Sequence, residues 1–444
     1  MKKISYEAKK DYLSQLLDES SSDITAVLRI NAITKYGLVN DEIRKRAWPK
    51  LLDASYREND IIITNRNDYE NHFYYNQVVM DIERTLKRFP PGLDPSERLV
   101  LQNKAINIIM SILYENDDIH YYQGYHDIAI TIILVLTEEK PSLFILKQIT
   151  PKFLKDFTGP TGSSGLEFAL SYTYPIIACS NPRLALFLEN KMDLNPPLFC
   201  LPQMITWFAR ASHTASCNNV NHRQIYPNQA VASRVFEVFV ATRDPRAPLY
   251  LCAAQLISSP KIKDFLTHEA MVNAESIRDT IDDLLDNDMN IPPKDLTENQ
   301  EEISDPAVIH SQLMSCLSQI GMDGEEGLEG VLSRACQSMV LFPSVKMESA
   351  RKAYADRCSQ RETKEKLARE ERNANFTQNQ KRRRTAKDKI IPLPLNPFFI
   401  SSFFILLFAI VIGIYMYSRN HPENRKANNN ITTNFTDNNL ILGL

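Results

Sequence analysis

The sequence predicts an all-α protein with one membrane-spanning helix near its C-terminus. Up to about residue 290, apolar residues recur at helical spacing, and no region shows sustained period-two alternation. Residues 398–417 form a run of twenty residues without a charge. At about 1.5 Å per residue, such a helix crosses a hydrocarbon core of about 30 Å. A buried core helix is seldom apolar on every face, so this run favours a membrane span.

Three helices can be predicted from local signals. Apolar residues at three- and four-residue steps predict a helix over residues 68–88, which the following Phe-Pro-Pro-Gly stretch ends. Asp94 and Glu97 form a capping-box pattern around Pro95 and predict a helix over residues 96–114. Residues 128–136 are nearly all apolar and predict a buried helix.

Composition and motif content exclude several classes of function. The formal net charge of -3 gives no general affinity for nucleic acid. The seven cysteines are dispersed and lack a C-x-x-C pair, which argues against a disulfide framework and a zinc ribbon and favours reduced thiols in the cytosol. The sequence has no P-loop motif, so we expect no nucleotide site, cofactor or metal of its own.

The flanks of the uncharged run predict its orientation. The N-terminal flank carries more basic residues, which keeps the large N-terminal part in the cytosol and places residues 418–444 in the lumen. Because 27 residues follow the run, we expect insertion after translation, as a tail anchor. The predicted location is the endoplasmic reticulum membrane, with the early Golgi as the alternative.

A charged segment precedes the predicted span. Residues 346–389 contain 15 basic and 7 acidic residues and too few apolar ones for a core, which predicts a partly helical linker. Its end is a basic collar, which either only sets the membrane topology or also binds anionic lipid headgroups. The collar consists of Lys381, Arg382, Arg383, Arg384, Lys387 and Lys389.

Three short segments carry the clearest functional signal. They read RKRAWPKLL at residues 44–52, DIERT at 81–85 and YYQG at 121–124. Together they resemble the motifs R-x-x-x-W-x-x-L, I-x-x-D-x-x-R-T and Y-x-Q-G of the TBC-domain family of Rab GTPase-activating proteins, with Val78 in place of the isoleucine. With the predicted tail anchor, the chain looks most like the endoplasmic-reticulum subfamily.

The resemblance implies a two-lobed helical TBC domain and a catalytic role for Arg84 and Gln123. The partner, a Rab-family small GTPase in its GTP form, would bring the nucleotide and Mg²⁺, so this chain would be a catalytic activator rather than an enzyme with its own nucleotide site. The resemblance further implies that Gln123 takes over the water-positioning role usually held by the GTPase. Asp81, Tyr121 and Gly124 would support the two catalytic residues.

The chemistry of GTP hydrolysis explains these residue types. Negative charge sits on the transferred oxygens in the transition state, and an arginine supplied in trans stabilises it, which is worth about 10³ to 10⁵ in rate. A carboxamide can accept a hydrogen bond from the attacking water while its NH₂ group donates one to a phosphate oxygen, which suits Gln123 beside a turn glycine. Asp81 lies three residues before Arg84 on one helical face and can hold its guanidinium.

Arg44 and Trp48 are expected to join the core or an internal ion pair. His120 and His126 are expected to pack or form hydrogen bonds rather than bind metal. Gln123 has a simpler alternative role, as an amide that caps the helix starting near His126.

The resemblance covers about residues 30–290 and leads to a predicted organisation of the chain. Glu237 stands where the family has an aspartate, and the polar insertion at 213–229 is longer than the family pattern. The predicted segments are 1–29 as a lead segment, 30–290 as the TBC domain, 291–345 as a helical extension, 346–397 as the linker, 398–417 as the span and 418–444 as a luminal tail.

Two other functions remain open at this point. The first is a catalytically silent Rab-binding scaffold or effector with the same fold, which loss of Arg84 or Gln123 would have favoured. The second is a membrane tether or coiled coil, which would require sustained apolar heptads before the span that residues 346–389 do not supply. We therefore expect an activator of a Rab in the early secretory pathway, with a role in transport between the endoplasmic reticulum and the Golgi.

Overall fold

Every regular element in the described part of the chain is a helix, which confirms the all-α prediction. The computed structural model describes residues 5–19, 24–87, 89–160, 162–191, 194, 196–210, 227–263, 306–320 and 327–388. Within these residues no helix has the length and apolar composition needed to cross a bilayer. The predicted span at 398–417, the luminal tail and the 213–226 part of the polar insertion lie outside them.

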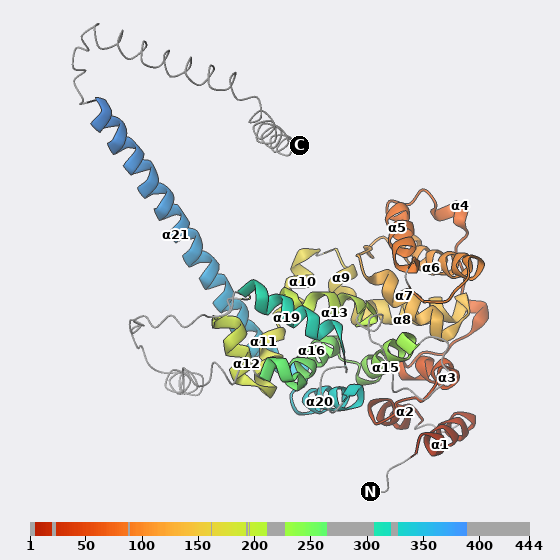
Figure 1. Cartoon of the computed structure of the whole chain (residues 1–444). Coiled ribbons are helices and arrows are strands. Elements are labelled where there is room, and N and C mark those ends of the chain that lie inside the picture. The colour runs from red at the N-terminus through yellow and green to blue at the C-terminus, as the bar shows by residue number, and fades with distance from the viewer. Residues whose placement is uncertain are drawn as a thin grey trace, which may run out of the picture. The chain divides into compact units, whose positions relative to one another are not determined.

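Figure 1 shows the helices in chain order. The first half contains α1 (Tyr6–Asp18), α2 (Ile24–Ile33), α3 (Asp41–Leu51), η1 (Glu58–Asp60), α4 (Arg66–Tyr69), α5 (Tyr75–Leu86), α6 (Pro95–Glu115), α7 (Tyr125–Leu136), α8 (Glu139–Phe153), α9 (Lys155–Thr158), α10 (Ser163–Leu170), α11 (Thr173–Ser180), α12 (Pro182–Leu186) and η2 (Phe187–Lys191). The second half contains η3 (Leu198–Cys200), α13 (Leu201–Thr206), α15 (Pro227–Thr242), α16 (Ala247–Ser258), α19 (Pro306–Ser318), α20 (Gly327–Leu341), η4 (Ser344–Met347) and α21 (Glu348–Asp388).

The packing brings segments together that are far apart in the sequence. Helices α5, α6, α7 and α8 pack on one another, and α16 packs against α11, α19 and α20. Helix α15 contacts α2, α3 and α7, and also α16 and α20. The described residues up to 361 form one compact unit, and the described residues from 362 to 388 belong to a second one. The two-lobed arrangement stays a prediction.

Two of the three predicted helices are confirmed. Helix α6 begins with the expected capping box: Asp94 Oδ1 accepts from the Glu97 amide at 2.8 Å, and Glu97 Oε2 accepts from the Asp94 amide at 3.0 Å. Helix α7 is buried along nearly its whole length, as its apolar run predicts.

The prediction of one helix over residues 68–88 is wrong in its first part, because the helical conformation is interrupted between α4 and α5. His72 Nδ1 accepts the amide proton of Tyr74 at 3.2 Å, and the Tyr74 hydroxyl bonds His120 Nδ1 at 3.0 Å. Phe73, one of the apolar positions in the predicted pattern, is 88% exposed. Side-chain contacts with a distant loop therefore replace one helical turn.

The compact unit runs past the predicted start of the linker at residue 346. The Ser344 hydroxyl donates to Asp244 at 2.8 Å. Tyr354 is buried, and the centroid of its ring lies 5.5 Å from that of the Tyr174 ring. Met347, the last residue of η4, and Tyr354, in the second turn of α21, are both buried, so the start of α21 belongs to the compact unit. Helices α19 and α20, from the predicted extension, also pack within this unit.

A buried carboxylate, Glu237 of α15, joins the N-terminal helices to the rest of the unit. Its side chain is 0% exposed and accepts from Arg44 Nε at 2.8 Å and from Arg234 Nη1 at 3.0 Å. It also accepts from the Leu38 amide at 3.1 Å. Burial alone would lower the pKa of both arginines, but the neighbouring carboxylates raise it. The expected internal ion pair of Arg44 is confirmed, and so is the burial of Trp48.

The loop before α3 leaves no room for a side chain next to Glu237. Gly37 has φ +50°, and a Cβ atom there would lie 1.6 Å from Glu237 Oε1. The second arginine, Arg234, also makes a two-pronged ion pair with Glu329 of α20, at 2.9 Å for each bond. One charged cluster, made of Glu237, Arg44, Arg234 and Glu329, thus holds together the loop before α3 and the helices α3, α15 and α20.

We expect Glu237→Gln to lower the free energy of unfolding by about 3–5 kcal/mol, because two buried arginines would lose their shared anion. Urea unfolding followed by the fluorescence of Trp48 and Trp207, both buried and the chain's two tryptophans, measures this. Glu42→Gln is the matched control, since Glu42 is 80% exposed in its pair with Lys45. An equal, small effect of both substitutions would contradict the central role of Glu237.

Candidate functional site

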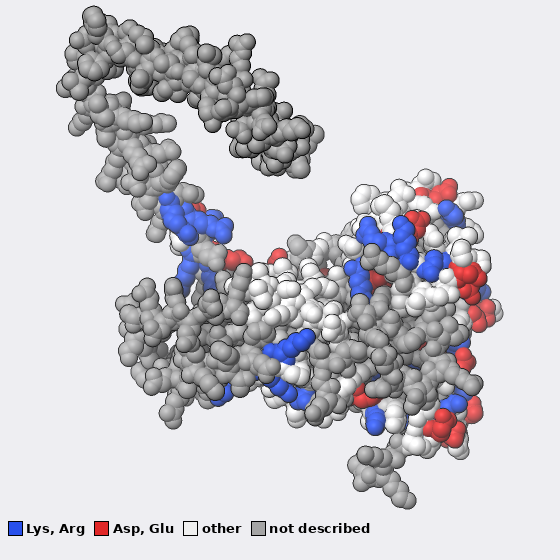
Figure 2. Space-filling view, in the orientation of Figure 1, with Lys and Arg blue, Asp and Glu red and all other residues white. Residues whose placement is uncertain are grey.

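Helix α5 presents Arg84 to solvent and buries the opposite face. Val78, Ile82 and Leu86 point into the core at four-residue steps, while the Arg84 side chain is 68% exposed. Arg84 Nη1 donates to Asp81 Oδ1 at 3.2 Å, and Asp81 is 8% exposed. The ion pair expected from the spacing is therefore present. Figure 2 shows basic side chains gathered over α5.

The turn at residues 121–124 lies against α5 through one hydrogen bond. The Tyr121 hydroxyl donates to Asp81 Oδ2 at 3.2 Å, so Asp81 contacts both Arg84 and the turn. Burial, followed by the charge of Asp81, raises the pKa of Tyr121, so the phenol stays protonated and able to donate. The structure thus links the two sequence motifs that were expected to act together.

The other side of the turn is fixed by α13. The Tyr122 hydroxyl donates to the carbonyl of Ile205 at 3.0 Å. Gly124 has φ +123°, and a Cβ atom there would lie 3.2 Å from the same carbonyl oxygen. The glycine of the motif is therefore required both by its backbone conformation and by close packing.

Gln123 projects from this clamped turn into solvent. Its carboxamide makes no hydrogen bond to the residues that the structure describes, and α7 has no side-chain cap at its first turn. The alternative role of Gln123 as a helix-capping amide is therefore wrong. Arg84 and Gln123 are both accessible, and the segments that carry them are joined through Asp81 and Tyr121.

Beneath the turn lies a buried polar cluster around His126. Its ring bonds the Tyr121 hydroxyl through Nδ1 at 2.9 Å and the Thr85 hydroxyl through Nε2 at 3.1 Å. Burial lowers the pKa of His126, while Asp127 and Asp81 oppose this effect. The expectation that His120 and His126 form hydrogen bonds is confirmed.

Three residues of the site were not predicted from the sequence: Thr85, Asp127 and Arg210. Asp127 is fully buried, and its Oδ1 accepts from the Thr85 hydroxyl at 3.3 Å. Its Oδ2 accepts from Arg210 Nε at 2.8 Å. Thr85 was visible only as part of a motif. The signal for Asp127 was a carboxylate next to an apolar helical run, which requires a partner when buried.

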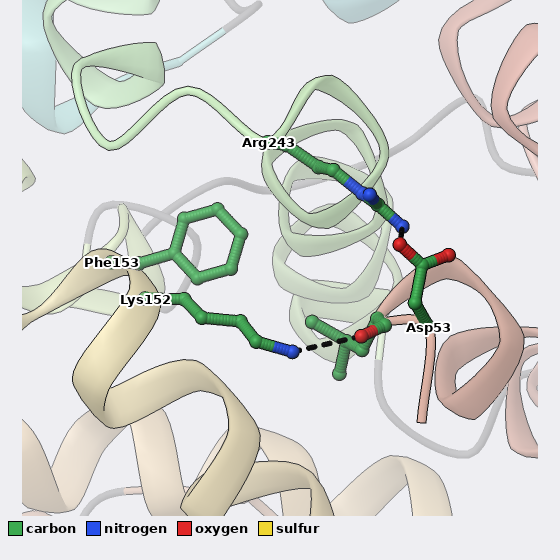
Figure 3. A pocket seen from close by; sticks show the side chains of 5 residues that line it. Asp53, Lys152, Phe153 and Arg243 are labelled. Atoms are coloured by element: carbon green, nitrogen blue, oxygen red, sulfur yellow. Dashed lines mark hydrogen bonds and ion pairs between the residues drawn. The ribbon is translucent and has the colours of Figure 1, made fainter. Parts of the chain in front are cut away.

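A separate hollow, shown in Figure 3, lies away from these residues. It has a volume of about 260 Å³ and is lined by Leu52, Asp53, Lys152, Phe153 and Arg243. Its cations are already engaged: Lys152 Nζ donates to the Leu52 carbonyl at 2.8 Å, and Arg243 pairs with Asp53 and donates to the Leu51 carbonyl at 2.9 Å. These bonds satisfy carbonyls at the end of α3, so the hollow has a structural role.

The described residues contain no group of three or more His, Cys, Asp or Glu side chains arranged to hold a metal. The site itself exposes a guanidinium, that of Arg84, and a carboxamide, that of Gln123. Such a pair can stabilise negative charge and orient a water, but it offers no nucleophile of its own.

Fold and site thus define an all-helical domain that presents an arginine and a glutamine from one hydrogen-bonded cluster. Residues 41–220 match the model of the Rab-GTPase-TBC domain family. This matched range includes both exposed residues, Arg84 and Gln123.

Known proteins of similar sequence agree with this family. TBC1 domain family member 20 is 35% identical over 239 residues in Bos taurus, covering 54% of each chain, and 34% identical over 241 residues in Homo sapiens. The GTPase-activating protein GYP8 of Saccharomyces cerevisiae is 25% identical over 271 residues, 55% of this chain and 50% of that protein. The chain spans about half the length of the curated relatives it matches.

Among solved structures, the Ypt/Rab-GAP domain of Gyp1p aligns with a TM-score of 0.47 at 14% identity, over 76% of this chain and 99% of that one. A flagellar RabGAP TBC domain from Chlamydomonas aligns with a TM-score of 0.44 at 11% identity, over 76% and 96%.

The depressed pKa of His126 predicts a loss of stability in mild acid. The unfolded chain takes up a proton near pH 6.5, before the buried imidazole does, so the free energy of unfolding falls as the pH drops below about 6.5. Urea unfolding at pH 7.5, 6.5 and 5.5 measures this slope. His126→Gln should flatten it and His310→Gln on α19 should not. If the free energy of unfolding of His126→Gln still falls below pH 6.5 as in the wild type, His126 is not the source of the pH dependence.

Proposed function

We propose that this chain is a GTPase-activating protein for a Rab-family small GTPase. The observation that carries the proposal is that Arg84 and Gln123 are exposed while their segments are tied together through Asp81 and Tyr121. Relatives of similar sequence, GYP8 and the Schizosaccharomyces pombe protein gyp10, are named GTPase-activating proteins. The partner GTPase in its GTP form would supply the nucleotide and Mg²⁺.

In this proposal, Arg84 leaves Asp81 and places its guanidinium on the negative charge that develops around the γ-phosphate. The planar fork of arginine can contact two oxygens at once, which a lysine cannot do. The Gln123 side-chain oxygen accepts a hydrogen bond from the attacking water, and its NH₂ group donates one to a phosphate oxygen. Tyr121 and Gly124 fix the turn so that the amide needs little reorganisation in the transition state.

We further propose that the activator works at the membrane of the endoplasmic reticulum, on a Rab of the early secretory pathway that serves transport to the Golgi. The support is the uncharged run at residues 398–417 with its basic N-terminal flank. In this proposal the N-terminal domain faces the cytosol, and the basic collar contacts anionic lipid headgroups.

Arg84→Ala and Gln123→Ala should each remove most of the acceleration of GTP hydrolysis, by about 10²-fold or more, because each deletes a group that acts in the transition state. The measurement is single-turnover hydrolysis by a panel of GTP-loaded Rab proteins with the full chain in detergent micelles. Binding of the GTP-loaded Rab should survive both changes.

The matched controls are Arg183→Ala on α12 and Gln15→Ala on α1, both exposed and outside the site. Unchanged rates in both site variants would end the assignment of Arg84 and Gln123. A wild-type chain that binds GTP-loaded Rab without accelerating hydrolysis on any member of the panel would instead indicate a silent scaffold.

Deletion of residues 398–417 should release the chain from membranes into the soluble fraction, because the basic collar alone gives only salt-sensitive binding. Fractionation of cells that express the full chain and the deletion variant, with a carbonate wash of the membrane pellet, measures this. Retention of the deletion variant in the washed pellet would contradict the proposed anchor.

A further inference from the structure

Arg210 stands at the edge of the candidate site and is held by an anchored turn. Trp207 and Phe208, just before it, have φ values of +51° and +63°, a left-handed conformation that costs energy in residues with a Cβ. Both side chains are buried, and the Trp207 ring lies 5.2 Å from the ring of Phe236. The core contacts of these two residues therefore fix the backbone that leads to Arg210.

The Arg210 guanidinium pairs with a carboxylate that has no access to water. Its Nε donates to Asp127 Oδ2 at 2.8 Å, and Asp127 is 0% exposed while Arg210 is 46% exposed. A carboxylate in this position is costly unless it is paired, and removal of its partner leaves an uncompensated buried charge. Arg210 is the cation that the described structure places on Asp127.

Asp127 touches the residues that adjoin both proposed catalytic groups. Its Oδ1 accepts from the hydroxyl of Thr85, the residue after Arg84, at 3.3 Å. It also lies 3.5 Å from His126 Nε2, and His126 Nδ1 bonds Tyr121, two residues before Gln123. A change in the charge or place of Asp127 therefore reaches both segments.

We propose that Arg210 is a positioning residue for the activation of GTP hydrolysis, acting through Asp127 on the segments that carry Arg84 and Gln123. This inference rests on the proposed function. Arg210 holds the Asp127 carboxylate in place through the ion pair, so that Thr85 and His126 keep their hydrogen bonds. It is not a group that touches the phosphates of the partner.

The test is a double-mutant cycle on the full chain with a Rab that the wild type activates. Arg210→Gln leaves Asp127 without a cation, since the Gln amide can donate a hydrogen bond but carries no charge, and Asp127→Asn removes the anion that Arg210 pairs with, so each should lower the maximal single-turnover rate about tenfold. In the double variant the Gln oxygen can accept from the Asn amide, and the rate should return to within about threefold of wild type. The concentration for half-maximal rate should change less than about twofold throughout.

Arg210→Lys keeps the positive charge but lacks the Nε–H donor, so its rate should lie between those of Arg210→Gln and the wild type. Arg183→Gln on α12 is the control and should leave the rate unchanged. Tryptophan fluorescence of each variant reports whether it is folded. If Arg210→Gln does not fold, a folded double variant with a near-normal rate still supports the pairing, and an unfolded or slow one overturns it.

Three results would overturn the inference while the proposed function stands: a normal rate in Arg210→Gln, a double variant no faster than Arg210→Gln, or a loss confined to the half-maximal concentration. The second would mean that Arg210 acts on the phosphates, and the third that it binds the GTPase. Failure of the wild-type chain to accelerate any Rab would instead refute the proposed function.

Discussion

The fold depends on a carboxylate that is completely shielded from water. Glu237 is 0% exposed and receives two arginines and a backbone amide from the loop before α3. Each buried charge in this cluster is tolerable only because the others are present, so α3, α15 and α20 have to come together. The same cluster requires a glycine at position 37, because a Cβ there would overlap the Glu237 side chain.

A second set of buried acidic groups lies under the candidate site, and it differs from the first in one respect. The arginines around Glu237 are sealed, at 3% and 6% exposed. The arginines paired with Asp81 and Asp127 are 68% and 46% exposed. The first cluster can serve only the fold. The second ends in guanidinium groups at the surface, and a negatively charged ligand can compete with Asp81 for that of Arg84.

Local sequence signals predicted those parts of the structure that depend on local physics. The capping box at Asp94 and the apolar run of α7 act within one helix, and both helices formed where expected. At the break before α5, Tyr74 bonds His120 across 46 residues of sequence, and Asp127 meets Arg210 across 83 residues. Spacing within a segment cannot reveal such pairs. The motifs predict that Arg84 and Gln123 act in one site, whereas the contacts of Thr85, Asp127 and Arg210 are visible only in the fold.

The two proposed catalytic groups differ in whether their side chains have a bonding partner in the unbound chain. Gln123 is exposed and makes no hydrogen bond to the described residues, so a ligand meets a free carboxamide on a turn that Tyr121, Tyr122 and Gly124 hold in place. Arg84 is bound to Asp81 in a pair whose guanidinium is 68% exposed and whose carboxylate is 8% exposed. A phosphate can reach the guanidinium from the solvent side, while Asp81 keeps its bond from Tyr121. The aspartate therefore restrains the arginine between encounters and still has a hydrogen-bond donor when the arginine turns to the phosphate.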